Sequence, residues 1–174
     1  MKSSDLIKHL TESGLMPQEE TLELPRSEKN LFIGIPREKA LQENRVALVP
    51  DSVGLLVNNG HRVIVESNAG EPANFTDKDY SEAGAEIVSD AKDVYRANII
   101  IKVAPPTLEE VAMFDPMQKQ ILFSALQITS QPKDCMKQLM KQKVTCVAYD
   151  FIKDRDGVYP IVRSMSEIAG NTSI

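Results

Sequence analysis

Short apolar runs rich in β-branched residues recur along the chain from residue 31 onward, and a polar or amphipathic stretch separates each run from the next. Continuous apolar runs of this length are typical of strands buried on both faces of a parallel sheet. The pattern predicts strands at Leu31–Ile35, His61–Glu66, Asn98–Val103, Gln120–Ser124 and Val144–Tyr149.

The stretches between these runs carry helix signals. N-terminal signals occur at Asp51 or Ser52, at Thr76, at Thr107–Glu110, at Ser130 with Pro132, and at Ser164–Glu167. The first helix is expected to end at Asn59-Gly60 and the second near Gly84. Regular alternation of strands and helices predicts a doubly wound α/β domain with a mostly parallel sheet, Rossmann-like or flavodoxin-like in its winding.

The first 30 residues stand apart from this alternation. Leu6, Ile7 and Leu10 are expected to form one stripe of a short helix that stops at Gly14, and the following polar stretch is typical of a linker. We therefore expect an N-terminal extension and linker over residues 1–30 and the folded domain over residues 31–174.

Composition narrows the class of protein. The chain has 174 residues, which suits one domain, and its net charge of −5 argues against a nucleic-acid surface. No apolar run approaches the roughly 20 residues of a membrane helix. Cys135 and Cys146 lack metal-type spacing, and the N-terminus lacks the apolar core of a secretory signal, so we expect a cytoplasmic protein without a metal site.

Several catalytic motifs are absent from the sequence. The eight glycines are widely spaced, so neither GxGxxG nor GxxxxGK[ST] is present, and there is no GxSxG elbow. The domain is therefore expected to lack the glycine-rich loop that holds a nucleotide pyrophosphate. His9 and His61 are isolated and more typical of structural histidines than of a general base.

Arg45 is the first candidate for ligand binding. Pro36 ends the first predicted strand, and a charged loop that includes Arg45 follows it. In open α/β sheets ligands bind at this carboxyl edge, and a guanidinium among apolar neighbours suits bidentate capture of a small carboxylate. The alternative is that Arg45 only pairs with Glu38 or Glu43 on the surface, which is what most such charges do.

Lys102 is the second candidate, because it follows three isoleucines at the carboxyl end of a predicted central strand. There its ammonium would lie beside the Arg45 loop, where it would hold a keto or carboxylate oxygen or take part in proton transfer. The alternative is a strand-end lysine whose ammonium reaches solvent. The residues alone leave both interpretations open.

Six segments resemble, in order, the N-terminal domain of the alanine dehydrogenase and pyridine-nucleotide transhydrogenase alpha-subunit family. They are IGIPRE, ENRVALVP, NNGHRVIVESNAGE (Asn58–Glu71), FTDKDYSEAGAEIV (Phe75–Val88), IIIKV (Ile99–Val103) and MSEIAG (Met165–Gly170). Together they extend over roughly residues 31–172, which is nearly all of the predicted domain.

The resemblance implies a substrate domain that binds pyruvate or alanine, with NAD bound mainly by a separate domain inserted after MSEIAG. It assigns the substrate carboxylate to Arg45, a place near the cofactor phosphates to Ser166, and the lysine of the KV dipeptide to Lys102. It also implies a homo-oligomer. A chain that stops at Ile174 is then expected to be an excised fragment or a split subunit, inactive alone.

Two positions depart from the alanine dehydrogenase pattern. Ala104 replaces a second lysine that contacts the keto oxygen, and Gln127 stands where those enzymes carry a histidine. Transhydrogenase alpha subunits also lack that pair, whereas residues 154–164 are more similar to the alanine dehydrogenases. Residues two apart on a strand share a face, so Lys102 is hypothesised to reach the space that Ala104 leaves.

The sequence thus favours the substrate domain of an NAD-dependent enzyme resembling alanine dehydrogenase, which interconverts L-alanine and pyruvate. The first alternative is a transhydrogenase alpha-subunit domain, which passes hydride between NADH and NADP. The second is a non-catalytic module that keeps the fold and binds a partner or a small acid.

Overall fold

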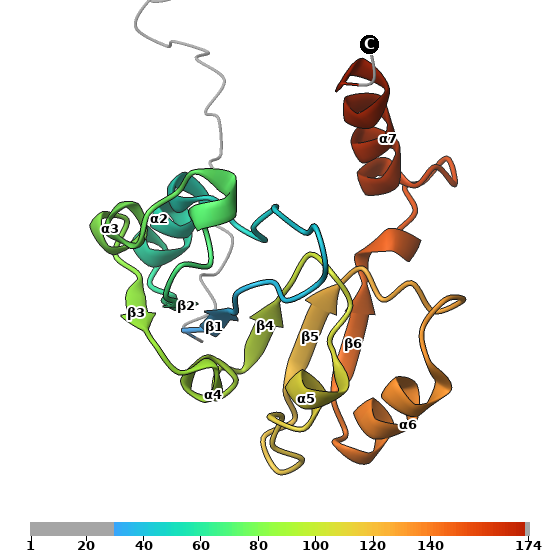
Figure 1. Cartoon of the computed structure of the whole chain (residues 1–174), viewed down its shortest axis with the longest axis horizontal. Coiled ribbons are helices and arrows are strands. Elements are labelled where there is room, and N and C mark those ends of the chain that lie inside the picture. The colour runs from blue at the N-terminus through green and yellow to red at the C-terminus, as the bar shows by residue number, and fades with distance from the viewer. Residues whose placement is uncertain (1–29, 173–174) are drawn as a thin grey trace, which may run out of the picture.

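The computed structural model describes residues 30–172, which form an α/β domain around a six-stranded sheet (Figure 1). The strands are β1 (Phe32–Ile35), β2 (Arg62–Glu66), β3 (Glu86–Val88), β4 (Ile99–Ile101), β5 (Ile121–Ser124) and β6 (Thr145–Ala148). Their spatial order is β3-β2-β1-β4-β5-β6, and every neighbouring pair is parallel. The predicted fold class is confirmed.

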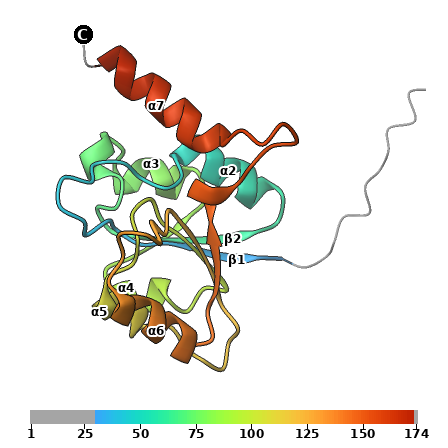
Figure 2. The ribbon, with the colours of Figure 1, turned by 90° about the vertical axis from the view of Figure 1, so that its right-hand side faces the viewer.

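Helices cover both faces of this sheet. They are α2 (Pro50–Asn58), α3 (Asp77–Glu82), α4 (Ala91–Val94), α5 (Leu108–Val111), α6 (Lys133–Lys141) and α7 (Pro160–Thr172), with 3-10 turns at Glu71–Ala73 and Tyr149–Phe151. In Figure 2, α2, α3 and α7 lie on one side of the sheet and α4, α5 and α6 on the other. The order and the two layers are those of a doubly wound sheet.

Strand alternation divides the core between the two faces. Val63 and Val65 of β2 pack with Val53 of α2, whereas Ile64 between them packs with Leu122 and the α4–α6 layer. Successive strand side chains point to opposite faces, so a continuous apolar run fills both layers. This is why the five predicted strands lie where their apolar runs do.

β1 and β4 form the central pair, where the winding of the sheet changes direction. Ile33 pairs with Ile99 and Gly34 with Ile100. From this pair the chain winds toward β2 and β3 on one side and toward β5 and β6 on the other. The loops that leave the two strands therefore diverge and open a crevice at the carboxyl edge, the usual place for a ligand.

Some predicted helix starts are wrong. Helix α2 begins at Pro50, ahead of Asp51, and has no side-chain cap. Helix α6 follows Pro132, and the Ser130 hydroxyl bonds the Gln127 carbonyl instead. Helix α7 begins at Pro160, so Ser164 lies inside it and donates to the Pro160 carbonyl. In these helices a proline at or just before the first turn sets the start, because its fixed φ suits that position.

The capping signals at Thr76 and Thr107 are confirmed. Each side chain accepts from the backbone N–H three residues on, and Asp79 and Glu110 complete the two capping boxes. The C-cap residues of helices α2 and α3 are Asn59 and Ala83, and each precedes a glycine, Gly60 or Gly84, whose positive φ of 85° or 92° suits glycine. The predicted extension over residues 1–30 lies almost wholly outside the described residues.

Candidate functional site

Two adjoining pockets lie at the carboxyl edge of the sheet. The polar pocket, of about 330 Å³, is lined by Glu43, Arg45, Ala104, Gln127, Asp150 and Ser166, among others. The apolar pocket, of about 350 Å³, is lined mainly by aliphatic and aromatic side chains. Arg45, Val103, Tyr149 and Met165 line both. The site thus combines the loops that follow β1, β4, β5 and β6 with one face of α7.

The Arg45 guanidinium lies at the junction of the two pockets and is held by Glu43. Nε donates to Oε1 of Glu43 at 2.7 Å and Nη2 donates to Oε2 at 2.5 Å, while Nη1 lies 3.9 Å from Sδ of Met165. Both sequence interpretations are therefore present in one residue. Arg45 pairs with Glu43, as the surface interpretation expects, and it also lines a pocket.

This pairing fixes the charges of both groups. The hydrogen bonds from Arg45 lower the pKa of Glu43, and the same contact raises the pKa of Arg45. A guanidinium has five N–H donors, and Glu43 uses one on Nε and one on Nη2. The edge formed by Nη1 and the second N–H of Nη2 remains for a ligand carboxylate.

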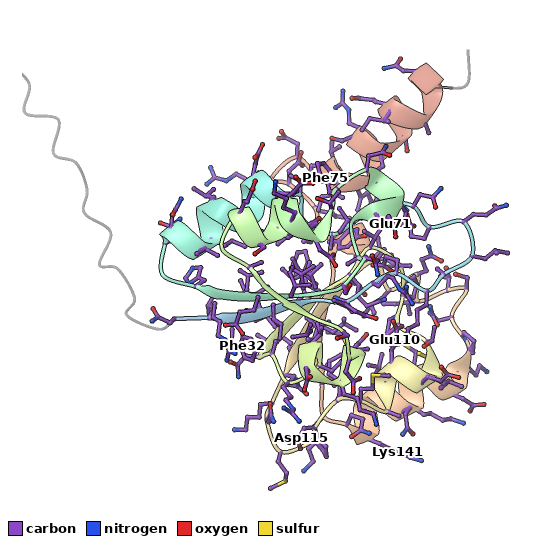
Figure 3. All side chains as sticks on the ribbon, turned by 60° about the vertical axis from the view of Figure 1, so that its left-hand side comes forward. Phe32, Glu71, Phe75, Glu110, Asp115 and Lys141 are labelled. Atoms are coloured by element: carbon purple, nitrogen blue, oxygen red, sulfur yellow. The ribbon has the colours of Figure 1, made fainter. Side chains whose placement is uncertain are left out.

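Lys102 is among the residues that line the apolar pocket, but its ammonium is enclosed by two carboxylates. Its ammonium lies 3.1 Å from Oε2 of Glu38 and 2.9 Å from Oε1 of Glu110, and all three side chains are at most 5% exposed. Figure 3 shows Glu110 on the side that α5 and α6 cover, away from Phe75. The Lys102 ammonium neither reaches solvent nor faces the polar pocket, so the predicted catalytic role stays a prediction that this geometry does not favour.

Glu38 connects this buried ion cluster to the pocket wall. Its carboxylate accepts from the Val103 N–H at 2.6 Å and is 3.4 Å from the Ala104 nitrogen. Glu66, at the end of β2, accepts from the Arg37 N–H at 2.9 Å. Two carboxylates thus hold the backbone of the loops after β1 and β4, and a charge-assisted bond of this kind gives those loops a fixed shape.

Tyr149 and Asp150 also line the polar pocket, although neither is predicted as a candidate from the sequence. The Tyr149 hydroxyl donates to the Val103 carbonyl at 2.7 Å, and burial raises the pKa of this tyrosine. The Asp150 carboxylate accepts from the backbone N–H groups of Leu126 and Gln127 at 3.2 and 3.1 Å. Both residues follow β6, and their place at the carboxyl end of a predicted strand was the available signal.

Ser166 lies on α7 and lines the polar pocket with Arg45, so the structure brings these two predicted site residues together. The Ser166 hydroxyl donates to the Val162 carbonyl at 2.8 Å. Ala104 and Gln127 line the same pocket. Neither has an ionisable side chain, so the two positions supply no proton donor there.

The described residues do not fit a complete NAD site. The turn after β1, where a nucleotide-binding domain has its glycine-rich loop, contains Pro36 and the carboxylate of Glu38 instead. Within residues 30–172 there is also no group of three or more His, Cys, Asp or Glu side chains able to hold a metal ion.

None of the helices in the described part of the chain combines the length and the apolar character needed to cross a bilayer. The cysteines Cys135 and Cys146 are free thiols, one buried and the other partly exposed. Burial raises the pKa of both.

The structure is an open, doubly wound α/β domain with two adjoining pockets at its topological switch point. A family model described as Alanine dehydrogenase/PNT, N-terminal domain, matches residues 34–169. This chain belongs to that family, as the sequence segments indicated.

Relatives place it nearer to the alanine dehydrogenases. It is 40% identical over 141 residues to an alanine dehydrogenase of Bacillus subtilis (strain 168), covering 80% of this chain and 36% of that protein. It is 41% identical over 145 residues to an alanine dehydrogenase of Methanococcus maripaludis, and the match covers 83% of this chain and 38% of that protein. The chain thus spans little more than a third of the length of these relatives.

Solved structures of the same family are also similar to this chain. An L-alanine dehydrogenase superposes with a TM-score of 0.77 and 37% identity, over 82% of this chain and 38% of that one. A transhydrogenase from Sinorhizobium meliloti superposes with a TM-score of 0.64 and 25% sequence identity. The match covers 71% of this chain and 36% of the transhydrogenase chain. The chain is an alanine dehydrogenase-like N-terminal domain, with transhydrogenase as a more distant structural neighbour.

Proposed function

We propose that this domain binds the small oxo or amino acid substrate of an NAD-dependent oxidoreductase of the alanine dehydrogenase type. The reaction would convert L-alanine, NAD⁺ and water to pyruvate, ammonium and NADH with release of a proton. The observation that supports it most directly is Arg45, at the junction of two pockets with one donor edge of its guanidinium directed away from Glu43.

The chain's own residues account for binding and orientation. Arg45 would take the substrate carboxylate on its Nη1–Nη2 edge, because two parallel charge-assisted bonds fix both position and angle. Glu43 would keep the guanidinium oriented, and the backbone held by Glu38 would form the facing wall. Ser166 would lie beside the nucleotide, which a further domain would hold, and this chain alone would be inactive.

The test uses the full-length natural polypeptide with pyruvate, ammonia and NADH, comparing Arg45→Lys with the unmodified protein. Lysine keeps the charge but loses the planar fork. A charge-assisted bond contributes about 1.5–3 kcal/mol, so we expect kcat/KM to fall by about 10- to 150-fold, chiefly through KM.

Arg62→Lys is the matched control, because Arg62 forms the same kind of fork with Glu86, at 2.7 Å, on the surface at β2. It should leave both kinetic constants unchanged. Normal kinetics in Arg45→Lys would contradict the proposed role of Arg45.

A transhydrogenase domain is the second candidate, favoured by the non-ionisable side chains of Ala104 and Gln127 in the polar pocket. It predicts that NADPH reduces an NAD analogue when a membrane-embedded partner is present, with no turnover of pyruvate. If neither reaction occurs and a protein partner is recovered, the non-catalytic module is the better account. A cytoplasmic location and a homo-oligomeric full-length protein also remain proposals.

A further inference from the structure

The apolar pocket lies directly beside Arg45 and has a wall made of hydrocarbon. Val46, Ala47 and Leu48 from the loop after β1 face Ile101 of β4, Phe123 of β5 and Ile161 of α7. The volume of about 350 Å³ falls in the range in which pockets enclose ligands larger than a three-carbon acid.

The polar groups near this wall already have partners. The Lys102 ammonium is bonded to Glu38 and Glu110, and the Tyr149 hydroxyl donates to the Val103 carbonyl. Apart from Arg45, the pocket therefore offers a ligand side chain mainly apolar contact. A polar or charged tail entering it would lose hydration without gaining a partner.

Arg45 connects the two pockets, and this determines how an acid would lie. A carboxylate on the Nη1–Nη2 edge leaves the rest of the molecule between Met165 and Val103, which line both pockets. In that orientation the oxo or amino group would face the polar pocket, with Asp150 and Ser166 in its wall, and the side chain would enter the apolar pocket.

We propose that the substrates are 2-oxo acids, and the corresponding amino acids, with branched aliphatic or aromatic side chains. This inference rests on the proposed function for the reaction type and for Arg45, and it replaces alanine and pyruvate as the preferred substrates by larger acids of the same class. Pyruvate brings only a methyl group to the apolar pocket and leaves most of that wall in contact with water. Each methylene added in such a pocket changes kcat/KM by about 10- to 200-fold.

The experiment measures kcat/KM of the full-length natural polypeptide with NADH and ammonia for three acids. They are pyruvate, 4-methyl-2-oxopentanoate and 2-oxoglutarate. We expect the branched acid to exceed pyruvate by at least about 10-fold, and 2-oxoglutarate to be the poorest because it buries an unpaired charge. Equal or better use of pyruvate would overturn the inference.

Ala47→Leu tests the pocket itself, because the larger side chain fills part of it. The ratio of kcat/KM for the branched acid to that for pyruvate should fall by about 10-fold or more. Ala112→Leu is the matched control, since Ala112 is exposed at the end of α5 on the opposite face. It should leave the ratio unchanged. An unchanged ratio in Ala47→Leu would also overturn the inference.

Calorimetric binding of the same acids separates this inference from the proposed function. If no acid is turned over, the dehydrogenase proposal fails on its own. Tighter binding of 4-methyl-2-oxopentanoate than of pyruvate, weakened by Ala47→Leu, would still support an apolar-acid site. Undetectable binding of the branched acid, or equal binding of both acids, would exclude it.

Discussion

Two cationic side chains at the same edge of the sheet, Arg45 and Lys102, differ in burial and therefore in role. Arg45 is 55% exposed and lies in a pocket wall, so its ion pair with Glu43 can orient a binding group while leaving it accessible. Lys102 is 1% exposed and surrounded by two carboxylates, so its charge stabilises the junction of β1, β4 and α5. From the sequence alone both are ligand-binding candidates, because both follow strands at the same edge of the sheet.

The enclosed position of Lys102 predicts a large stability effect. Lys102→Met would leave Glu38 and Glu110 as buried, unpaired carboxylates, so we expect the free energy of unfolding to fall by about 3–5 kcal/mol. Denaturant unfolding of the full-length polypeptide measures this.

Lys137→Met is the control, because the Lys137–Asp134 pair spans 3.6 Å on the surface and should change stability by less than about 1 kcal/mol. If Lys102→Met instead keeps normal stability and loses oxo acid turnover, Lys102 has the catalytic role that the sequence suggested.

At the scale of secondary structure, sequence predicts the elements whose signals are strong and local. All five long apolar runs form strands. Strand β3 was missed because Glu86–Val88 is short, lies at the sheet edge and is only half-buried, so its sequence is not continuously apolar. Helix α4 was missed because Ala91–Val94 is a single turn capped by Asp90, too short for a periodic pattern.

The residues of the candidate site were predictable only in part, because sequence shows where a loop lies more readily than where its side chains point. Loops that follow parallel strands share one edge, so Arg45 could be placed there from sequence. The face to which a strand-end side chain points depends on register and on nearby partners. Glu110, eight residues after Lys102, determines where that ammonium lies, and its main sequence signal was a helix cap.

Gly34 of β1 gives the prediction that belongs to this scale. A Cβ at Gly34 would lie 2.6 Å from the Val94 carbonyl oxygen and 2.9 Å from Val94 Cγ1, so β1 and α4 would have to separate. We expect Gly34→Ala to lower the free energy of unfolding by about 1–3 kcal/mol.

Gly54→Ala is the matched comparison and should have the opposite sign. A Cβ at Gly54 would meet nothing closer than 3.8 Å, and alanine in a helix interior is favoured by about 0.5–1 kcal/mol. Urea unfolding of the two variants side by side tests the pair. Equal effects would mean that the contact between Gly34 and Val94 is looser than described.

On the scale of the whole domain, buried tyrosines connect the helical layers to the site. Tyr80 of α3 is fully buried, and its hydroxyl donates to the Leu48 carbonyl at 2.8 Å, which anchors the loop that contains Arg45. Tyr149 makes the corresponding bond to Val103 from the other side of the crevice. Burial raises the pKa of Tyr80, Tyr95 and Tyr149, so the uncharged phenols belong to the folded state.

This arrangement predicts a loss of stability at alkaline pH. Burial raises the pKa of Tyr80 from 10.0 to about 12, so between those values the folded domain keeps a proton that the unfolded chain releases. The contribution of the uncharged Tyr80 phenol to the free energy of unfolding is therefore fully present below pH 10 and is lost as the pH rises toward 12.

Tyr80→Phe should lower the free energy of unfolding by about 1 kcal/mol at neutral pH, because the Leu48 carbonyl loses its donor. The same variant should show a shallower decline in stability above pH 10. Urea unfolding at a series of pH values measures both effects, with Tyr159→Phe, at an exposed ring, as the control. A decline as steep in Tyr80→Phe as in the unmodified protein would mean that the Tyr80 proton does not contribute to alkaline unfolding.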